Sequence, residues 1–168
     1  HLRMFLQLGR HLDECEAATR AARTLLERIH TPVQVDAIRL CHHAILQLRG
    51  NDAGSPAEGR RLADDIVASG NAQYAFQHGE MQMLVHTLLG DWEAAQRWWD
   101  FARAREVAAS TLLVVPEYHL LEVLITSQHR WPRASEAERP GLLAELERNL
   151  MRLKEWSDAQ GVTLYGHG

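Results

Sequence analysis

The sequence predicts an all-α protein in which antiparallel helix pairs stack into a right-handed solenoid of seven or eight helices. Apolar residues recur with the 3.6-residue period of amphipathic helices along most of the chain, whereas no segment alternates with the two-residue period of a strand. The turns between the expected helices also recur at intervals of about 40 residues, which is typical of stacked helical repeats.

The composition fits a single folded domain that spans residues 1–168. The chain is 46% hydrophobic and 24% charged, which is ordinary for a globular protein. A formal net charge of −4 argues against direct nucleic-acid binding, and no apolar run is long enough to span a membrane. Two cysteines and the lack of a signal-peptide pattern favour a cytoplasmic location.

From its first and last residues we expect the chain to be a fragment of a longer protein.

The first half of the chain predicts three helices. Residues 12–29 place apolar side chains at i, i+3, i+4 and i+7, which forms one apolar stripe on a helix. The next two helices each begin with a capping residue followed by proline, and each ends at a glycine. These signals predict helices over residues 31–50 and 55–70, because glycine is favoured just after a helix end.

The second half predicts four more helices. Pro116 and Pro140 suit helix starts, since proline is tolerated in the first turn and disrupts a helix interior. Trp131 and Pro132 are expected in a loop. The predicted helices span residues 71–90, 91–110, 116–130 and 141–161.

The predicted helix-pair turns fall at Gly9, Gly50, Gly90 and about Arg130, at intervals of 41, 40 and roughly 40 residues. When the turns are aligned, the first helices of the pairs have apolar residues at matching positions. These positions are Cys41, Ile45 and Leu48, then Met81, Val85 and Leu88, then Leu121 and Ile125. One repeat therefore organises the chain.

The segment GDWEAAQRWWDFA, residues 90–102, resembles the second half of a tetratricopeptide repeat. The matching positions are a turn glycine, two bulky aromatic residues and two small alanines: Gly90, Trp92, Trp99, Ala95 and Ala102. The resemblance implies that the two tryptophans pack between helices. Trp98 lies about 100° around the helix from Trp99 and has no place in this pattern. We therefore expect Trp98 to face a partner or a neighbouring repeat.

The C-terminal half resembles the helical region of large bacterial signalling proteins that combine kinase-like, STAND AAA-type ATPase, GAF and histidine kinase domains. The resemblance is carried by PEYH at 116–119, by Asn149, Leu153 and Trp156, and by the link at 165–167. It implies a non-catalytic interaction or regulatory scaffold module of a sensor-kinase type protein. The alternative is a small-molecule-sensing helical domain of an ATPase-type transcription regulator, which would enclose an apolar pocket.

The sequence indicates no catalytic group, cofactor or metal site. His78 and His86 lie about 12 Å apart along one helix, and His42 and His43 point about 100° apart. Cys41 falls on an apolar stripe, where an inert thiol is expected. Neither a phosphate-binding glycine loop nor a kinase catalytic loop occurs in the sequence. The enzyme alternative would require a cleft in which several titratable side chains converge.

Helical-repeat proteins bind peptides on the concave surface formed by the first helix of each pair. Polar residues at equivalent positions off the apolar stripe are Arg39, His42, His43, Gln82, His119 and Glu122. With Trp98, these are the candidate partner-binding residues; an ordinary solvated helix face is the alternative interpretation. The expected partner is a protein, a peptide or another domain of the same polypeptide. Uncapped end repeats would also permit self-association.

Overall fold

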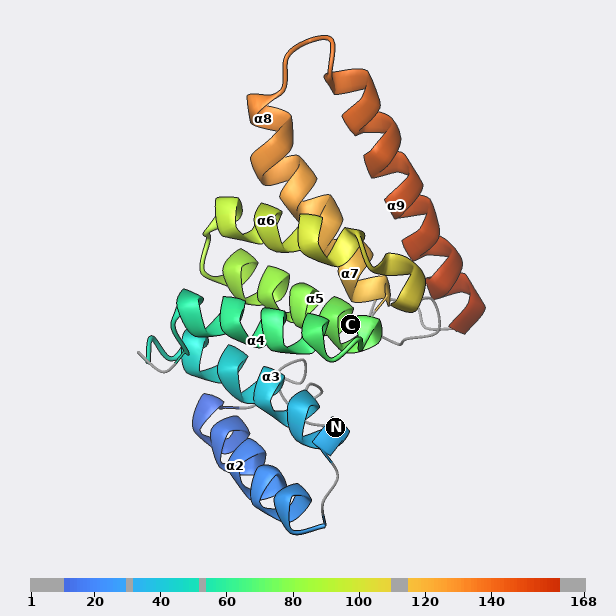
Figure 1. Cartoon of the computed structure of the whole chain (residues 1–168). Coiled ribbons are helices and arrows are strands. Elements are labelled where there is room, and N and C mark those ends of the chain that lie inside the picture. Colours follow the sequence, from blue (N-terminus) through green and yellow to red (C-terminus); the bar gives the residue numbers. More distant parts are fainter. Residues whose placement is uncertain (1–10, 30–31, 52–53, 110–114, 161–168) are drawn as a thin grey trace, which may run out of the picture.

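The computed structural model describes residues 11–29, 32–51, 54–109 and 115–160, in which helices are joined by short turns (Figure 1). No strand occurs among these residues, which confirms the all-α prediction. The described residues form seven longer helices: α2 (Leu12–Arg28), α3 (Pro32–Leu48), α4 (Pro56–Ala68), α5 (Ala72–Leu88), α6 (Trp92–Arg103), α7 (Val115–Ile125) and α9 (Arg139–Gln160). The shorter elements are the 3-10 helix η2 (Glu106–Ala109), the π-helical segment η3 (Thr126–Arg130) and α8 (Trp131–Arg133).

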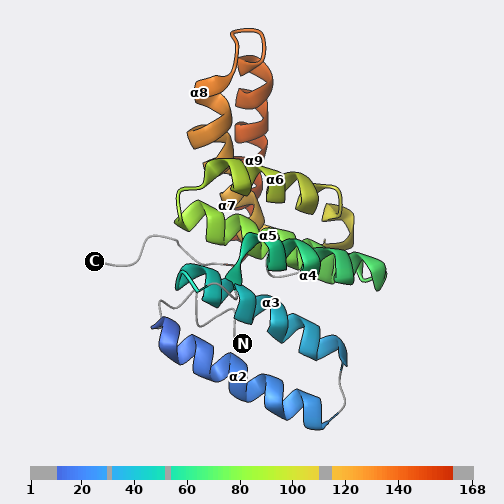
Figure 2. The same cartoon turned by 60° about the vertical axis from the view of Figure 1, so that its left-hand side comes forward.

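Helix α5 is the centre of the molecule. The helices follow one another from α2 at one end to α8 and α9 at the other (Figures 1 and 2). Helix α5 contacts α3, α4, α6, α7 and η2, so neighbours cover it on several faces. Ten of its 17 residues are buried, and these include His78, Glu80, Gln82 and His86. A central helix therefore carries polar side chains into the interior.

Gly50 and Gly90 end α3 and α5 in the same way. Both have positive φ, 66° and 73°, a conformation that glycine adopts without strain from a Cβ atom. In each turn the amide of the following residue donates to the carbonyl five residues earlier, at 2.9 Å, which is the Schellman pattern. The two turns thus share one backbone structure at the predicted spacing, whereas Gly9 lies outside the described residues.

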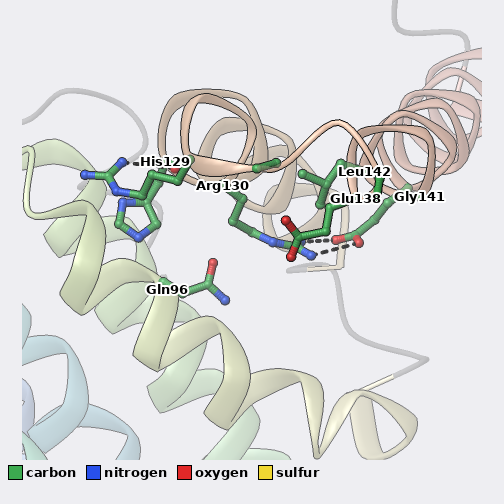
Figure 3. A pocket seen from close by; sticks show the side chains of 10 residues that line it. Gln96, His129, Arg130, Glu138, Gly141 and Leu142 are labelled. Atoms are coloured by element: carbon green, nitrogen blue, oxygen red, sulfur yellow. Dashed lines mark hydrogen bonds and ion pairs between the residues drawn. The ribbon is translucent and has the colours of Figure 1, made fainter.

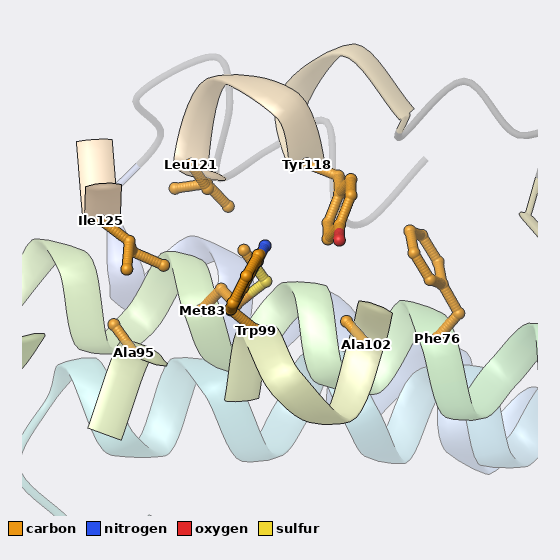
Figure 4. Packing of buried hydrophobic residues seen from close by; sticks show 8 residues of the cluster. All are labelled: Phe76, Met83, Ala95, Trp99, Ala102, Tyr118, Leu121 and Ile125. Carbon is orange, nitrogen blue, oxygen red and sulfur yellow. The ribbon is translucent and has the colours of Figure 1, made fainter. Parts of the chain in front are cut away.

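The main apolar core lies between α5, α6 and α7 (Figure 4). Its members are Phe76, Met83, Ala95, Trp99, Ala102, Tyr118, Leu121 and Ile125. Trp99 is only 4% exposed, and Ala95 and Ala102 have no exposed surface, as the repeat pattern predicts. Small residues allow α5 and α6 to approach closely, because a Cβ atom at Gly79 would lie 3.0 Å from that of Ala102. Trp92 is only partly buried.

Two predictions in the middle of the chain are wrong. Helix α6 ends at Arg103 rather than at residue 110, because the chain tightens into a turn in which the Arg105 amide donates to Ala102 O at 2.8 Å. Leu88, expected on the apolar stripe with Met81 and Val85, is 63% exposed. It is the last residue of α5, directly before the turn at Gly90.

The third helix-pair turn does not occur at Arg130. Segment η3 continues α7, and Trp131 and Pro132, expected in a loop, are helical in α8. The wider π turn lets the Trp131 amide donate to Thr126 O, so the helix adjusts just before a proline that has no amide hydrogen. The chain turns later, at residues 134–138, and the 40-residue spacing does not extend to this pair.

Candidate functional site

The six polar residues among the candidate partner-binding residues do not form one exposed row. Four of the six are at most 8% exposed: His43, Gln82, His119 and Glu122. The expectation that these four side chains face solvent is wrong, because neighbouring helices cover them. Arg39, His42 and Trp98 keep some exposed surface, and partner binding by these three stays a prediction.

His43 and His78 each make buried polar contacts that connect α3, α4 and α5. Nε2 of His43 lies 3.2 Å from Ser55 O, and its Nδ1 lies 3.3 Å from Nε2 of Gln82. Nε2 of His78 lies 2.8 Å from Gly59 O. Burial lowers the pKa of both histidines, that of His78 to about 4. Both rings are therefore neutral at pH 7, and they join helices rather than offer charge to a partner.

His119 and Glu122 join α7 to α9. Nδ1 of His119 lies 3.4 Å from Oε2 of Glu122, and Nη1 of Arg152 lies 3.5 Å from Nε2 of His119. Burial acts to raise the pKa of Glu122, but hydrogen bonds from His119 and Asn149 outweigh burial and lower it. The carboxylate is thus ionised and paired inside the structure, so it serves packing between these helices.

Arg39 and His42 line a recess of about 110 Å³ between α2, α3 and α4. Arg39 donates to Oδ1 of Asp36 at 3.2 Å, and Nδ1 of His42 lies 3.0 Å from Oγ1 of Thr19. The recess is smaller than a typical small-molecule site, and both polar side chains are already engaged. These residues therefore offer only a weak candidate surface.

Trp98 lies in a groove between α4 and α6, which we call the α4–α6 groove. The groove has a volume of about 290 Å³, and its lining includes Arg60, Asp64, Arg97, Trp98 and Phe101. The Trp98 ring packs edge-on against His78 and Phe101, with centroid distances of 5.1 and 5.4 Å. It therefore has a packing role that sequence reasoning missed, while part of its surface remains open to the groove.

A larger cavity of about 620 Å³ lies between α6, η3 and the beginning of α9, and we call it the α6–α9 cavity (Figure 3). Arg130 lies at its wall and binds Glu145 through both terminal nitrogens, with Nη2 3.2 Å from Oε2. The same guanidinium lies 4.7 Å from the centre of the Trp99 ring. Sequence reasoning missed this pair, because Arg130 and Glu145 lie 15 residues apart and their contact depends on the turn between them.

The described residues contain no group of three or more histidine, cysteine, aspartate or glutamate side chains that could hold a metal ion. Cys15 is buried and Cys41 is half-buried. Within the same part of the chain, no helix has the length and apolar character needed to cross a membrane. The α4–α6 groove and the α6–α9 cavity both present polar and charged side chains, and the groove adds two aromatic ones.

Comparison of the chain with protein-family models, with curated proteins and with solved structures found no match.

Proposed function

We propose that the chain is a non-catalytic protein-interaction module, a tetratricopeptide-like solenoid segment of a cytoplasmic bacterial signalling protein of the sensor-kinase type. Two features support this proposal. The turns after α3 and α5 have the same backbone structure 40 residues apart, as in stacked helix pairs. The module also carries a groove between the second helices of these pairs, and the groove contains a partly exposed tryptophan.

The α4–α6 groove is the observation that carries the proposal. Trp98 and Phe101 give it an aromatic floor, and aromatic residues of this kind anchor many protein interfaces. Arg60 and Arg97 line it together with Asp64 and Asp91, and neither arginine forms a salt bridge with another described side chain. Arginine pairs well with carboxylates. The matching partner is a peptide segment that places an apolar side chain on Trp98 and a carboxylate beside the arginines.

Binding at the groove has a direct route to the centre of the fold. The Trp98 ring contacts His78 on α5, and His78 in turn is hydrogen bonded to Gly59 O on α4. A partner that displaces Trp98 would change the packing between α4 and α5. Occupancy would thus be transmitted as a shift between helix pairs, since packed interfaces respond by discrete rearrangement.

The alternative of a sensor that encloses an apolar effector has less support. Such a sensor needs a closed apolar pocket, whereas the α6–α9 cavity is open to solvent and has two arginines and two glutamates in its wall. The α4–α6 groove is also open and partly charged. These features favour docking of a polypeptide over enclosure of an apolar ligand.

The test is selection of peptides from a random library displayed on phage, with the purified chain as bait. We expect the selected peptides to combine an apolar residue with a nearby aspartate or glutamate. Their affinity should fall at least tenfold in Trp98→Ala and in Arg97→Glu. Trp131→Ala is the matched control, because Trp131 is also half-buried but lies outside the groove; it should bind within twofold of wild type.

Selection of no peptide, or equal affinity in wild type, Trp98→Ala and Arg97→Glu, would overturn the proposal. Arg97 is exposed, so its charge reversal leaves the fold intact even if removal of Trp98 destabilises the chain. Circular dichroism of each variant establishes that the helices are retained before affinities are compared.

A further inference from the structure

The α6–α9 cavity is lined by charged side chains of both signs. Arg130 comes from η3 and Arg133 from α8, whereas Glu138 comes from the turn before α9 and Glu145 from α9 itself. The formal charges of this lining sum to zero, with two arginines and two glutamates. Figure 3 shows that the labelled residues come from both of these segments, with Gln96 pointing toward them from α6.

Arg130 and Glu145 neutralise each other, whereas Arg133 and Glu138 each keep polar atoms that can still form hydrogen bonds. Arg130 and Glu145 pair with one another at the inner side, over the Trp99 ring. Arg133 uses Nη1 to donate to His129 O at 3.0 Å, which leaves the rest of its guanidinium for another acceptor. Glu138 accepts from Ser135 N and Oγ through Oε2 alone, which leaves Oε1.

The wall also contains polar atoms that have no partner. His129 is 9% exposed and its Nδ1 makes no hydrogen bond, and Oε1 of Gln96 is likewise unpaired. Burial lowers the pKa of His129, so this ring is neutral at pH 7 and adds no charge to the wall. The hydrogen bonds from Ser135 lower the pKa of Glu138, so this carboxylate is ionised. Both unpaired atoms are covered by other protein atoms, so the groups that a ligand in the cavity can reach are the charged side chains.

A ligand that carries both charges matches this lining best. Its carboxylate would accept hydrogen bonds from Arg133, and its ammonium would donate to Glu138. A ligand with only one charge would leave either Arg133 or Glu138 without a charged partner. The volume of about 620 Å³ lies within the usual range of small-molecule sites, and Leu142 and Gly141 leave an apolar side for a side chain.

We propose that the α6–α9 cavity binds a small zwitterion, with an ammonium and a carboxylate group, of the size of a free amino acid or a dipeptide. This inference goes beyond the peptide docking assigned to the α4–α6 groove, because the two sites share no lining residue. Each can be lost without the other.

The test compares four forms of the same compounds by isothermal titration calorimetry with the full chain. The panel contains the twenty free amino acids and their alanyl dipeptides, together with their N-acetyl, amide and doubly blocked derivatives. We expect at least one free compound to bind. Its N-acetyl, amide and doubly blocked forms should bind at least tenfold more weakly, since each lacks one or both charges.

Variants of the two exposed mouth residues place the binding in the cavity. Arg133→Gln and Glu138→Gln should each weaken binding at least tenfold, because each removes a charged hydrogen bond. Arg148→Gln and Glu147→Gln are matched controls, since both residues are exposed on α9 and lie outside the cavity lining; they should bind within twofold of wild type.

The proposal is overturned if no zwitterion in the panel binds, or if the blocked forms bind as tightly as the free ones. Equal binding by wild type and by the double variant Arg133→Gln, Glu138→Gln also overturns it, because that result would indicate a general solute effect or another site.

Discussion

Protonation of His78 should make the fold sensitive to mild acid. The ring has no exposed surface, and its Nε2 lies 2.8 Å from Gly59 O, so the neutral ring donates one hydrogen bond. A second proton would sit on Nδ1, which is buried and has no acceptor. Burial accordingly lowers the pKa of His78 from 6.5 to about 4 in the folded chain.

The sign of the effect follows from the two pKa values. Above pH 6.5 the ring is neutral in both states, and His78 contributes no pH dependence. Between pH 6.5 and 4 the unfolded chain binds the proton and the folded chain does not. The free energy of unfolding therefore decreases as the pH is lowered through this range. With these values the loss attributable to His78 is about 2 kcal/mol at pH 5.

The assay is urea denaturation followed by circular dichroism at pH 7, 6 and 5, for wild type and for His78→Gln. Glutamine keeps a hydrogen-bond donor for Gly59 O but does not titrate. From pH 7 to 5, wild type should lose about 2 kcal/mol more than the variant. Parallel losses in the two proteins would refute the reasoning, as would an NMR titration in which the His78 ring of the folded chain takes up its proton near pH 6.5.

Three further predictions concern stability and are checked by urea denaturation at pH 7. Arg130→Met should cost about 3 kcal/mol, because it leaves Glu145 without its partner; adding Glu145→Leu should recover most of the loss, and no recovery would contradict the role of the pair. Gly90→Ala should cost about 1 to 2 kcal/mol from its positive φ alone, since no atom lies within 4 Å of the added Cβ; an unchanged stability would argue against that turn. Trp99→Ala should cost about 3 to 5 kcal/mol and more than Trp98→Ala, and the reverse order would contradict the assigned core.

The histidine and arginine interactions show why the sites were harder to predict than the helices. His43 and Gln82 fall off the apolar stripe in the sequence, which is typical of a solvated face. In the structure their helices pack side by side, and the two side chains meet at 3.3 Å. The sequence pattern reports the polarity of a residue but not which helix lies opposite it, so the predicted row of exposed residues was wrong for its buried members.

The sequence by itself determined the local features of this protein. Helix starts and ends depend on residues a few positions apart: Ser55 accepts from the Glu58 amide, Asp91 accepts from the Ala94 amide, and Gly90 supplies the positive φ. The small residues and Trp99 in the second helix of the repeat also follow from a local pattern, and they lie in the core as predicted.

Only the tertiary structure decided which polar residues are buried and where the cavities lie. The π turn at the end of α7 moved the next connection beyond Arg130, and this brought Arg130 against Glu145 on α9 and over Trp99 on α6. Such contacts join helices across long stretches of chain, and they depend on relative helix positions that no local pattern encodes. The groove around Trp98 and the α6–α9 cavity are both products of that packing.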